Sequence, residues 1–257
     1  MKMTFIRVAA AAAVLALAAS PAAADLVAAT ASYGRLLAQY VTPRGVKYEA
    51  WRTSGSDLKA ISEVVMLYRS TDPKPLSPDE RKALYINLYN AKVLETVLLG
   101  NPNGSIKELS RGLNPSEVFS RAGLNFDQKM ISLNDLEKRL REEFKDPRVH
   151  FAVNCASKSC PPIRPEPYDA ATLDAQLEES TRKYLASPGA VEVRTDGGKT
   201  RIVAVKIFDW YADDFKASGG ALAFIQKYGP PSAADAIAGG KAKLDFGEYD
   251  WSLNAAR

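Results

Sequence analysis

Three residues with chemically reactive side chains lie close together in the sequence: His150, Cys155 and Cys160. They are the chain's only histidine and its only two cysteines. A thiol becomes a nucleophile when a neighbouring base or cation favours the thiolate, and a third polar group then orients that base. The segment therefore predicts a thiol site. A zinc site of the usual type needs three or four such ligands, so we expect no metal, and no sequence motif indicates a cofactor.

The spacing of these residues favours Cys160 over Cys155 as the nucleophile. Polar and apolar residues alternate over Arg148–Asn154, which predicts a β-strand. Along a strand of about 3.3 Å per residue, Cys155 would lie roughly 16 Å from His150. Cys160 follows a loop that can turn back toward His150, and the proline after it can open a helical turn whose N-terminus favours a thiolate. We expect Cys160 to be the nucleophile, His150 the base and Asn90 the orienting amide.

Several polar side chains are candidates for binding. Asn87 and Asn90 lie three residues apart, on one face of a segment that is apolar on nearly every side and is typical of a buried helix. Buried amides must find hydrogen-bond partners, so both can be structural or part of the site. Two later segments, around Trp210 and Trp251, pair aromatic rings with carboxylates and can belong to the core or line a groove for a sugar or peptide. The expected binding residues are Asn87, Asn154, Ser157, Ser159, Trp210 and Asp214.

Helix and strand patterns indicate the elements that must position these residues. The segment Ser77–Glu80 predicts a helix start, because Ser77 can cap the helix, a proline suits its first position and Glu80 completes a capping box. The predicted helices cover residues 26–39, 58–68, 78–99, 133–144, 171–185 and 221–228. The predicted strands cover residues 148–154, 191–194, 201–207 and 241–246.

The order of these elements predicts one α+β domain over residues 25–257. Helices dominate the N-terminal half and strands come later, which is typical of this class. No repeat and no abrupt change of composition divides the chain. We expect the helical N-terminal half to pack on a mostly antiparallel sheet.

Residues 1–24 are predicted to be a cleaved signal peptide. A short basic start is followed by the apolar run Val8–Ala19 and by the small residues Ala22–Ala24, which suit signal peptidase. The run is shorter than the roughly 20 apolar residues that span a bilayer. We expect cleavage after Ala24 and a mature protein that is periplasmic or secreted.

Composition argues against two kinds of partner. A formal net charge of +4 over 257 residues, with no basic block, gives no electrostatic case for nucleic acid. No later stretch is long and apolar enough to span a membrane, so the mature protein is not expected to be membrane-embedded. The expected partner is an unknown envelope peptide or protein.

Four segments resemble those of the domain-of-unknown-function 547 family. They are, in order, Tyr85–Ala91, Arg148–Pro162, Phe208–Phe215 and Glu248–Asn254. The resemblance extends from about Leu36 to Asn254, and the family includes exported bacterial proteins. It has no assigned activity, so the resemblance implies no catalytic residues. It does mark His150, the cysteine pair and the asparagine helix as features of the family.

The cysteine pair leaves three interpretations open. Two cysteines five residues apart in an oxidising compartment most often form a disulfide, here Cys155–Cys160, which would stabilise the fold by roughly 2 kcal/mol. The second interpretation is a catalytic thiol. The third is a redox-cycling pair, although the spacing departs from C-x-x-C.

Two functional hypotheses follow. The first is a thiol-dependent hydrolase or acyl/peptidyl transferase that uses Cys160, His150 and an asparagine on an envelope peptide or amide. The second is a non-catalytic binding or scaffolding module, in which the disulfide braces a loop and His150 is an interior residue. They differ in whether the mature protein has a free thiol of low pKa.

Overall fold

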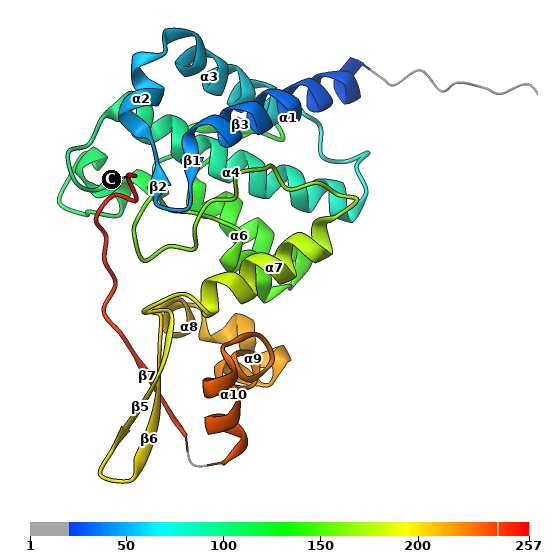
Figure 1. The fold of residues 1–257 in the computed structure, drawn as a ribbon. Helices are drawn as coiled ribbons and strands as arrows, with labels where there is room; N and C mark the ends of the chain where they lie inside the picture. The colour runs from blue at the N-terminus through cyan, green and yellow to red at the C-terminus, as the bar shows by residue number, and fades with distance from the viewer. Residues whose placement is uncertain (1–20, 241, 257) are drawn as a thin grey trace, which may run out of the picture.

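The computed structural model describes residues 21–240 and 242–256. The predicted signal peptide lies outside this part, apart from its last four residues, which begin the first helix. Within the described part, helices and three small sheets confirm the predicted α+β class (Figure 1). None of the helices described there has the length and apolar character needed to cross a bilayer.

A helical body forms the N-terminal part of the fold. Its helices are α1 (Pro21–Tyr40), α2 (Tyr48–Thr53), α3 (Gly55–Ser70), α4 (Pro78–Gly100), α6 (Leu133–Phe144) and α7 (Leu173–Leu185). Helix α4 crosses the middle of this body (Figure 1), and all of its residues over 83–91 are buried. This stretch of α4 is therefore buried on every side, as its sequence predicted.

Local sequence signals determine the ends of α4 and α6. The Ser77 hydroxyl accepts the Glu80 N–H at 3.3 Å, and the Glu80 carboxylate accepts the Ser77 N–H at 2.8 Å. Ser132 and Asp135 make the same capping box at the start of α6. At the other end of α4, Asn101 adopts a left-handed conformation that stops the helix. The predicted boundaries of both helices are confirmed.

The strands form two short hairpins and one larger sheet. They are β1 (Val41–Thr42), β2 (Gly45–Val46), β3 (Leu124–Phe126), β4 (Lys129–Ile131), β5 (Val191–Asp196), β6 (Lys199–Ala204) and β7 (Lys243–Phe246). β1 pairs with β2, and β3 with β4. In the larger sheet β5 and β6 form the predicted antiparallel hairpin, whereas β6 and β7 are parallel.

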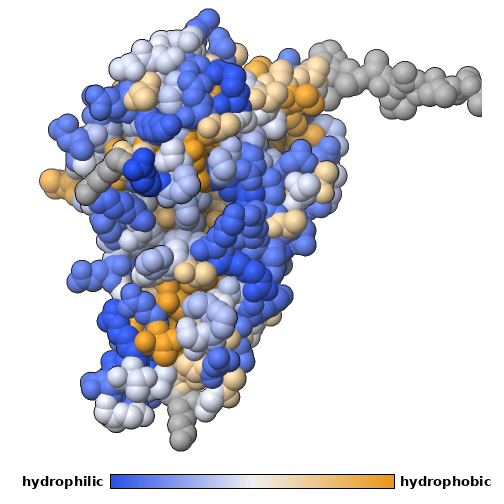
Figure 2. Space-filling view, viewed as in Figure 1, coloured by the Kyte–Doolittle hydropathy of each residue, from blue (hydrophilic) through white to orange (hydrophobic). Residues whose placement is uncertain are grey.

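The larger sheet shares its core with the C-terminal helices. Short helices between the strands and within the body are η1 (Ile106–Leu109), α5 (Glu117–Ser120), α8 (Ile207–Trp210) and η3 (Ala212–Ser218), and longer ones at the C-terminal end are α9 (Gly220–Tyr228) and α10 (Pro231–Ala238). Ile202 of β6 is fully buried in a cluster with Phe208 and Phe224, separate from the cluster that surrounds α4. Figure 1 shows this sheet and α10 at the end of the molecule opposite α1 to α3. Figure 2 shows a mostly hydrophilic face with apolar side chains visible at that end.

The strand predicted before the cysteines is wrong. Pro147–Phe151 forms a 3₁₀ helix, η2, because Asp146 caps it by accepting the Arg148 N–H at 3.1 Å and the proline is pre-set for a first helical position. The alternation over Val149–Asn154 does not separate two faces, since all of these residues are buried. The distance argument against Cys155 therefore no longer applies.

The last described residues return from β7 to the helical body as an extended C-terminal strap, residues 247–256 (Figure 1, red). The Val46 N–H donates to the Asn254 carbonyl at 2.9 Å, and the Ala256 N–H donates to the Val46 carbonyl at 2.9 Å. The Asn254 N–H donates to the Ala156 carbonyl at 3.0 Å. The strap thus joins β2 to the segment that carries the cysteines.

Candidate functional site

Residues 154–161 form a closed loop, the cysteine loop, which carries both thiols. The Asn154 side chain spans this loop: its Oδ1 accepts the Ala156 N–H at 2.8 Å and its Nδ2 donates to the Pro161 carbonyl at 2.7 Å. The Cys160 N–H donates to the Ser157 carbonyl at 3.2 Å. Asn154 is buried, so water does not compete for these bonds. The loop is held closed from inside.

Asn90 attaches this loop to α4. Its Nδ2 donates to the Ala152 carbonyl at 2.9 Å, and its Oδ1 accepts the Asn154 N–H at 2.8 Å. Asn87 makes the same pair of bonds, at 2.8 and 2.9 Å, with the backbone of Tyr168. Both predicted amides are buried and satisfied. Among the residues that the structure describes, neither is hydrogen-bonded to a sulfur.

Ala156, directly after Cys155, has a φ of 62°. Residues with a Cβ rarely adopt this left-handed conformation, which costs about 1 kcal/mol or more and persists where other contacts enforce it. Here Asn154 binds the Ala156 N–H and Asn254 of the strap binds its carbonyl. The reversal of the chain at this point lets the loop close five residues after Cys155.

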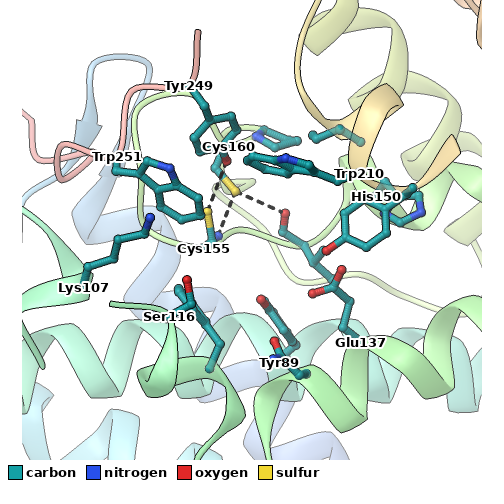
Figure 3. Close-up of a pocket in the computed structure, with 16 residues that line it drawn as sticks. Tyr89, Lys107, Ser116, Glu137, His150, Cys155, Cys160, Trp210, Tyr249 and Trp251 are labelled. Atoms are coloured by element: carbon teal, nitrogen blue, oxygen red, sulfur yellow. Dashed lines mark hydrogen bonds between the residues drawn. The ribbon is translucent and has the colours of Figure 1, made fainter. Parts of the chain in front are cut away.

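The two thiols lie next to each other at the centre of the site (Figure 3). Both cysteines are free, so the predicted Cys155–Cys160 disulfide is not formed in this structure. The Cys155 N–H donates to Cys160 Sγ at 2.9 Å. The Cys155 sulfur lies 3.1 Å from Ser157 Oγ and 3.3 Å from the Tyr249 hydroxyl. Cys155 is partly exposed, whereas Cys160 is buried.

These surroundings move the acidity of the two thiols in opposite directions. Burial raises the pKa of Cys155, but hydrogen bonds to its sulfur, that of Cys160 first, outweigh burial and bring the pKa to about 7. Burial raises the pKa of Cys160 well above its usual value, and the adjacent Cys155 raises it further. The geometry therefore favours Cys155 as the reactive thiol, where the sequence spacing favoured Cys160.

The thiols face a cavity of about 440 Å³, a volume typical of small-ligand sites. Its lining residues from separate elements include Tyr89 of α4, Lys107 of η1, Glu137 of α6, and Tyr249 and Trp251 of the strap. In Figure 3 the strap residues lie on one side of the sulfurs, and Tyr89 and Ser116 lie on the other. The cavity is therefore built where the helical body, the cysteine loop and the strap meet.

One wall of the cavity is aromatic and carries a cation. The Tyr249 ring lies 4.8 Å from that of Trp210 and 4.7 Å from that of Trp251. Lys107 Nζ lies 3.5 Å from the centre of the Trp251 ring, a cation–π contact. Trp210 keeps 47% of its surface exposed. This wall suits a planar substituent with negative charge.

His150 borders the cavity, and its hydrogen bond goes to Asp214. Its Nε2 lies 2.8 Å from Asp214 Oδ2, and its ring packs 4.2 Å from that of Tyr211. The bonds from His150 and Arg141 hold the pKa of Asp214 well below its ordinary value. In residues 21–240 and 242–256 no hydrogen bond joins His150 to a cysteine sulfur. The predicted base thus lines the same cavity as the thiols but is not hydrogen-bonded to either of them in this part of the chain.

The remaining predicted residues divide between the cavity and its framework. Trp210 lines the cavity, and Ser157 contacts the Cys155 sulfur. Ser159 belongs to the framework, because its Oγ accepts the Asp250 N–H at 2.8 Å. Over the described part of the chain, no cluster of three or more histidine, cysteine or acidic side chains could hold a metal ion.

Sequence reasoning did not identify all residues of the site. Lys107 and Glu137 have no motif around them, and no signal in the sequence could have found them. Tyr249 and Trp251 belonged only to an aromatic and acidic segment of uncertain role. That segment resembled a family motif, which was the available hint that the strap is part of the site.

Comparison with known families bears on part of this chain. Residues 73–185 match the model of a family described as "Protein of unknown function, DUF547". The match supports the predicted family and contains α4, His150 and the cysteine loop, but not the strap. No curated protein and no solved structure matches the chain.

Proposed function

We propose that this protein is exported and acts in the cell envelope as a thiol-dependent hydrolase or acyl/peptidyl transferase, with Cys155 as its nucleophile. The observation that carries the proposal is a partly exposed thiol, with a pKa of about 7, in a cavity of about 440 Å³. About half of such thiols are ionised at neutral pH, and the thiolate is the attacking species. The cavity is large enough for a peptide side chain or a short acyl group.

The proposed reaction breaks an amide bond. The Cys155 thiolate attacks the carbonyl carbon, the carbon–nitrogen bond breaks, and the leaving amine takes a proton from a titratable group of the cavity. Lys107 and Glu137 are the charged groups that line it. The thioester on Cys155 is then attacked by water or by a second amine, which releases the acyl group and restores the thiol. The Lys107 cation can stabilise the negative charge on the carbonyl oxygen.

Alkylation of the reduced mature protein tests this assignment. At pH 7, iodoacetamide should label Cys155 about tenfold faster than an unperturbed cysteine, with half-maximal rate near the pKa of the thiol. Cys155→Ser should abolish this labelling and the turnover of peptide amides or thioesters, while the thermal midpoint stays unchanged. If Cys155 labels no faster than an ordinary thiol, the proposal fails and the binding-module hypothesis takes its place.

The exported location is tested separately. The basic start, apolar run and small residues before Asp25 support it. In a Gram-negative host, the intact mass of the protein from the periplasmic fraction should correspond to a chain that starts at Asp25. Recovery of the full-length chain from the cytoplasm would contradict export.

A further inference from the structure

We propose a second activity for the same cavity: Cys155 and Cys160 act together as a dithiol that reduces a small aromatic disulfide and closes into a disulfide of their own. The inference rests on the proposed function only in its use of Cys155 as the attacking thiol. It assigns to Cys160 the role of the resolving thiol, which attacks the mixed disulfide formed on Cys155.

The first support is the position of the two thiols. The Cys155 N–H already donates to Cys160 Sγ at 2.9 Å. The loop between the cysteines is closed by Asn154, whose side chain binds Ala156 at one end and Pro161 at the other. A disulfide requires sulfurs close together on a suitable backbone, and here the loop already presents them to each other.

The second support is the asymmetry of the pair. Cys155 is partly exposed in the cavity, and Cys160 keeps only 9% of its surface accessible. A substrate in the cavity therefore meets Cys155 first. Cys160 is shielded from a second substrate molecule but remains next to the Cys155 sulfur. This arrangement separates an attacking thiol from a resolving one.

The exchange balances without any further reactant. The Cys155 thiolate attacks one sulfur of R–S–S–R, the sulfur–sulfur bond breaks, and the first R–S⁻ leaves. Cys160 then loses its proton to the departing thiolate, attacks the Cys155 sulfur and releases the second R–S⁻. Two electrons pass from the cysteines to the substrate, which is reduced to two thiols, and the cysteines are oxidised to the disulfide. A thiol in the envelope would return them to the reduced state.

The aromatic wall indicates which disulfides are accepted. The exposed face of Trp210 and the cation of Lys107, which lies over Trp251, favour a flat substituent with negative charge. The dianionic aromatic disulfide 5,5′-dithiobis(2-nitrobenzoate) has this chemistry, and its thiolate product is coloured.

The test uses the reduced mature protein with one equivalent of this disulfide. The wild type should release two equivalents of coloured thiolate, retain no adduct, and become about 2 Da lighter through loss of two hydrogens. Cys160→Ser should release one equivalent and retain the adduct on Cys155. Cys155→Ser should react at least about tenfold more slowly, because its remaining thiol is buried.

Retention of a stable adduct by the wild type would overturn the inference. Rapid alkylation of Cys155 in a sample of the same protein not treated with the disulfide would then show that the proposed nucleophile survives and that only the role of Cys160 has failed. If Cys155 is slow toward both reagents, the proposed function and this inference fail together. Thermal unfolding of both serine variants shows whether each variant is folded.

Discussion

The Tyr249 hydroxyl lies 3.3 Å from the Cys155 sulfur, although 94 residues separate the two in the chain. The same hydroxyl lies 3.1 Å from Ser157 Oγ. It reaches the site because the C-terminal strap returns across the cysteine loop. The acidity of the thiol therefore depends on a residue outside the segment that matches the family model.

Tyr249→Phe should raise the pKa of Cys155 above about 7. A hydrogen bond to a charged sulfur is worth about 1.5–3 kcal/mol, so the alkylation rate at pH 7 should fall by roughly sevenfold to eightyfold. The measurement is the pH dependence of alkylation. Tyr184→Phe is the matched control, since its hydroxyl donates to the Ser159 carbonyl of the same loop and not to a sulfur. Equal shifts in both variants would mean that loop packing, and not the Tyr249 bond, sets the acidity.

Asn90→Ala and Asn87→Ala form a second matched pair. Each amide lies buried on α4 and makes two hydrogen bonds to backbone. Each substitution should lower the free energy of unfolding by about 2–4 kcal/mol, because two buried backbone groups lose their partners. Only Asn90→Ala should also slow Cys155 alkylation, since Asn90, unlike Asn87, binds Asn154 at the start of the cysteine loop. Chemical denaturation and alkylation measure both effects, and an equal loss of reactivity in Asn87→Ala would contradict this division.

The helical frame was predictable from sequence because its signals are local. Ser77 and Glu80, and likewise Ser132 and Asp135, lie three residues apart and satisfy each other. The signal at Asp146 and Pro147 is equally local, but the strand predicted over residues 148–154 did not take it into account. That signal starts η2, and the alternation that imitated a strand does not mark two faces, because Val149, His150 and Phe151 are all buried.

The site was predictable only in part, because its contacts are distant in sequence. Asn254 Nδ2 donates to Asn154 Oδ1 across 100 residues, and Asn90 binds Asn154 across 64. Residue types identified the thiols and the amides. They did not show which sulfur is ionisable, because that depends on the hydroxyl of Tyr249 and on the burial of Cys160.

His150→Gln should leave the rate of Cys155 alkylation within about twofold of wild type at each pH. The reason is that the side chains of His150 and Cys155 share no hydrogen-bond partner among the described residues. His150 Nε2 bonds to Asp214 and not to sulfur. The variant should still lose stability, because the hydrogen bond between the buried His150 ring and the Asp214 carboxylate is lost. A large fall in alkylation rate at unchanged stability would instead restore the cysteine–histidine pair that the sequence suggested.

Asp214→Asn should change how stability depends on pH. His150 and Arg141 hold the pKa of Asp214 below its ordinary value, so the carboxylate stabilises the folded state above the unfolded pKa of about 3.9. That stabilisation is lost as the pH falls below this value toward the folded pKa. Wild type should therefore exceed the variant by about 1–3 kcal/mol near pH 7, with a shrinking difference below about pH 4. Denaturant titrations at several pH values measure this difference in unfolding free energy. A difference that grows as the pH falls would contradict the prediction.

Gly45→Ala should detach the strap from β2. Gly45 has a φ of +119°, and a Cβ there would lie 2.3 Å from the Asn254 carbonyl oxygen, so the backbone of the strap would have to move. Loss of about 2–4 kcal/mol is expected, together with slower Cys155 alkylation because the strap carries Tyr249. Gly189→Ala is the control: its φ of +82° is also left-handed, but a Cβ there meets nothing within 4 Å. It should cost about 1 kcal/mol through backbone strain alone and leave alkylation unchanged. Equal stability and equal reactivity of the two variants would show that the strap does not hold the site together.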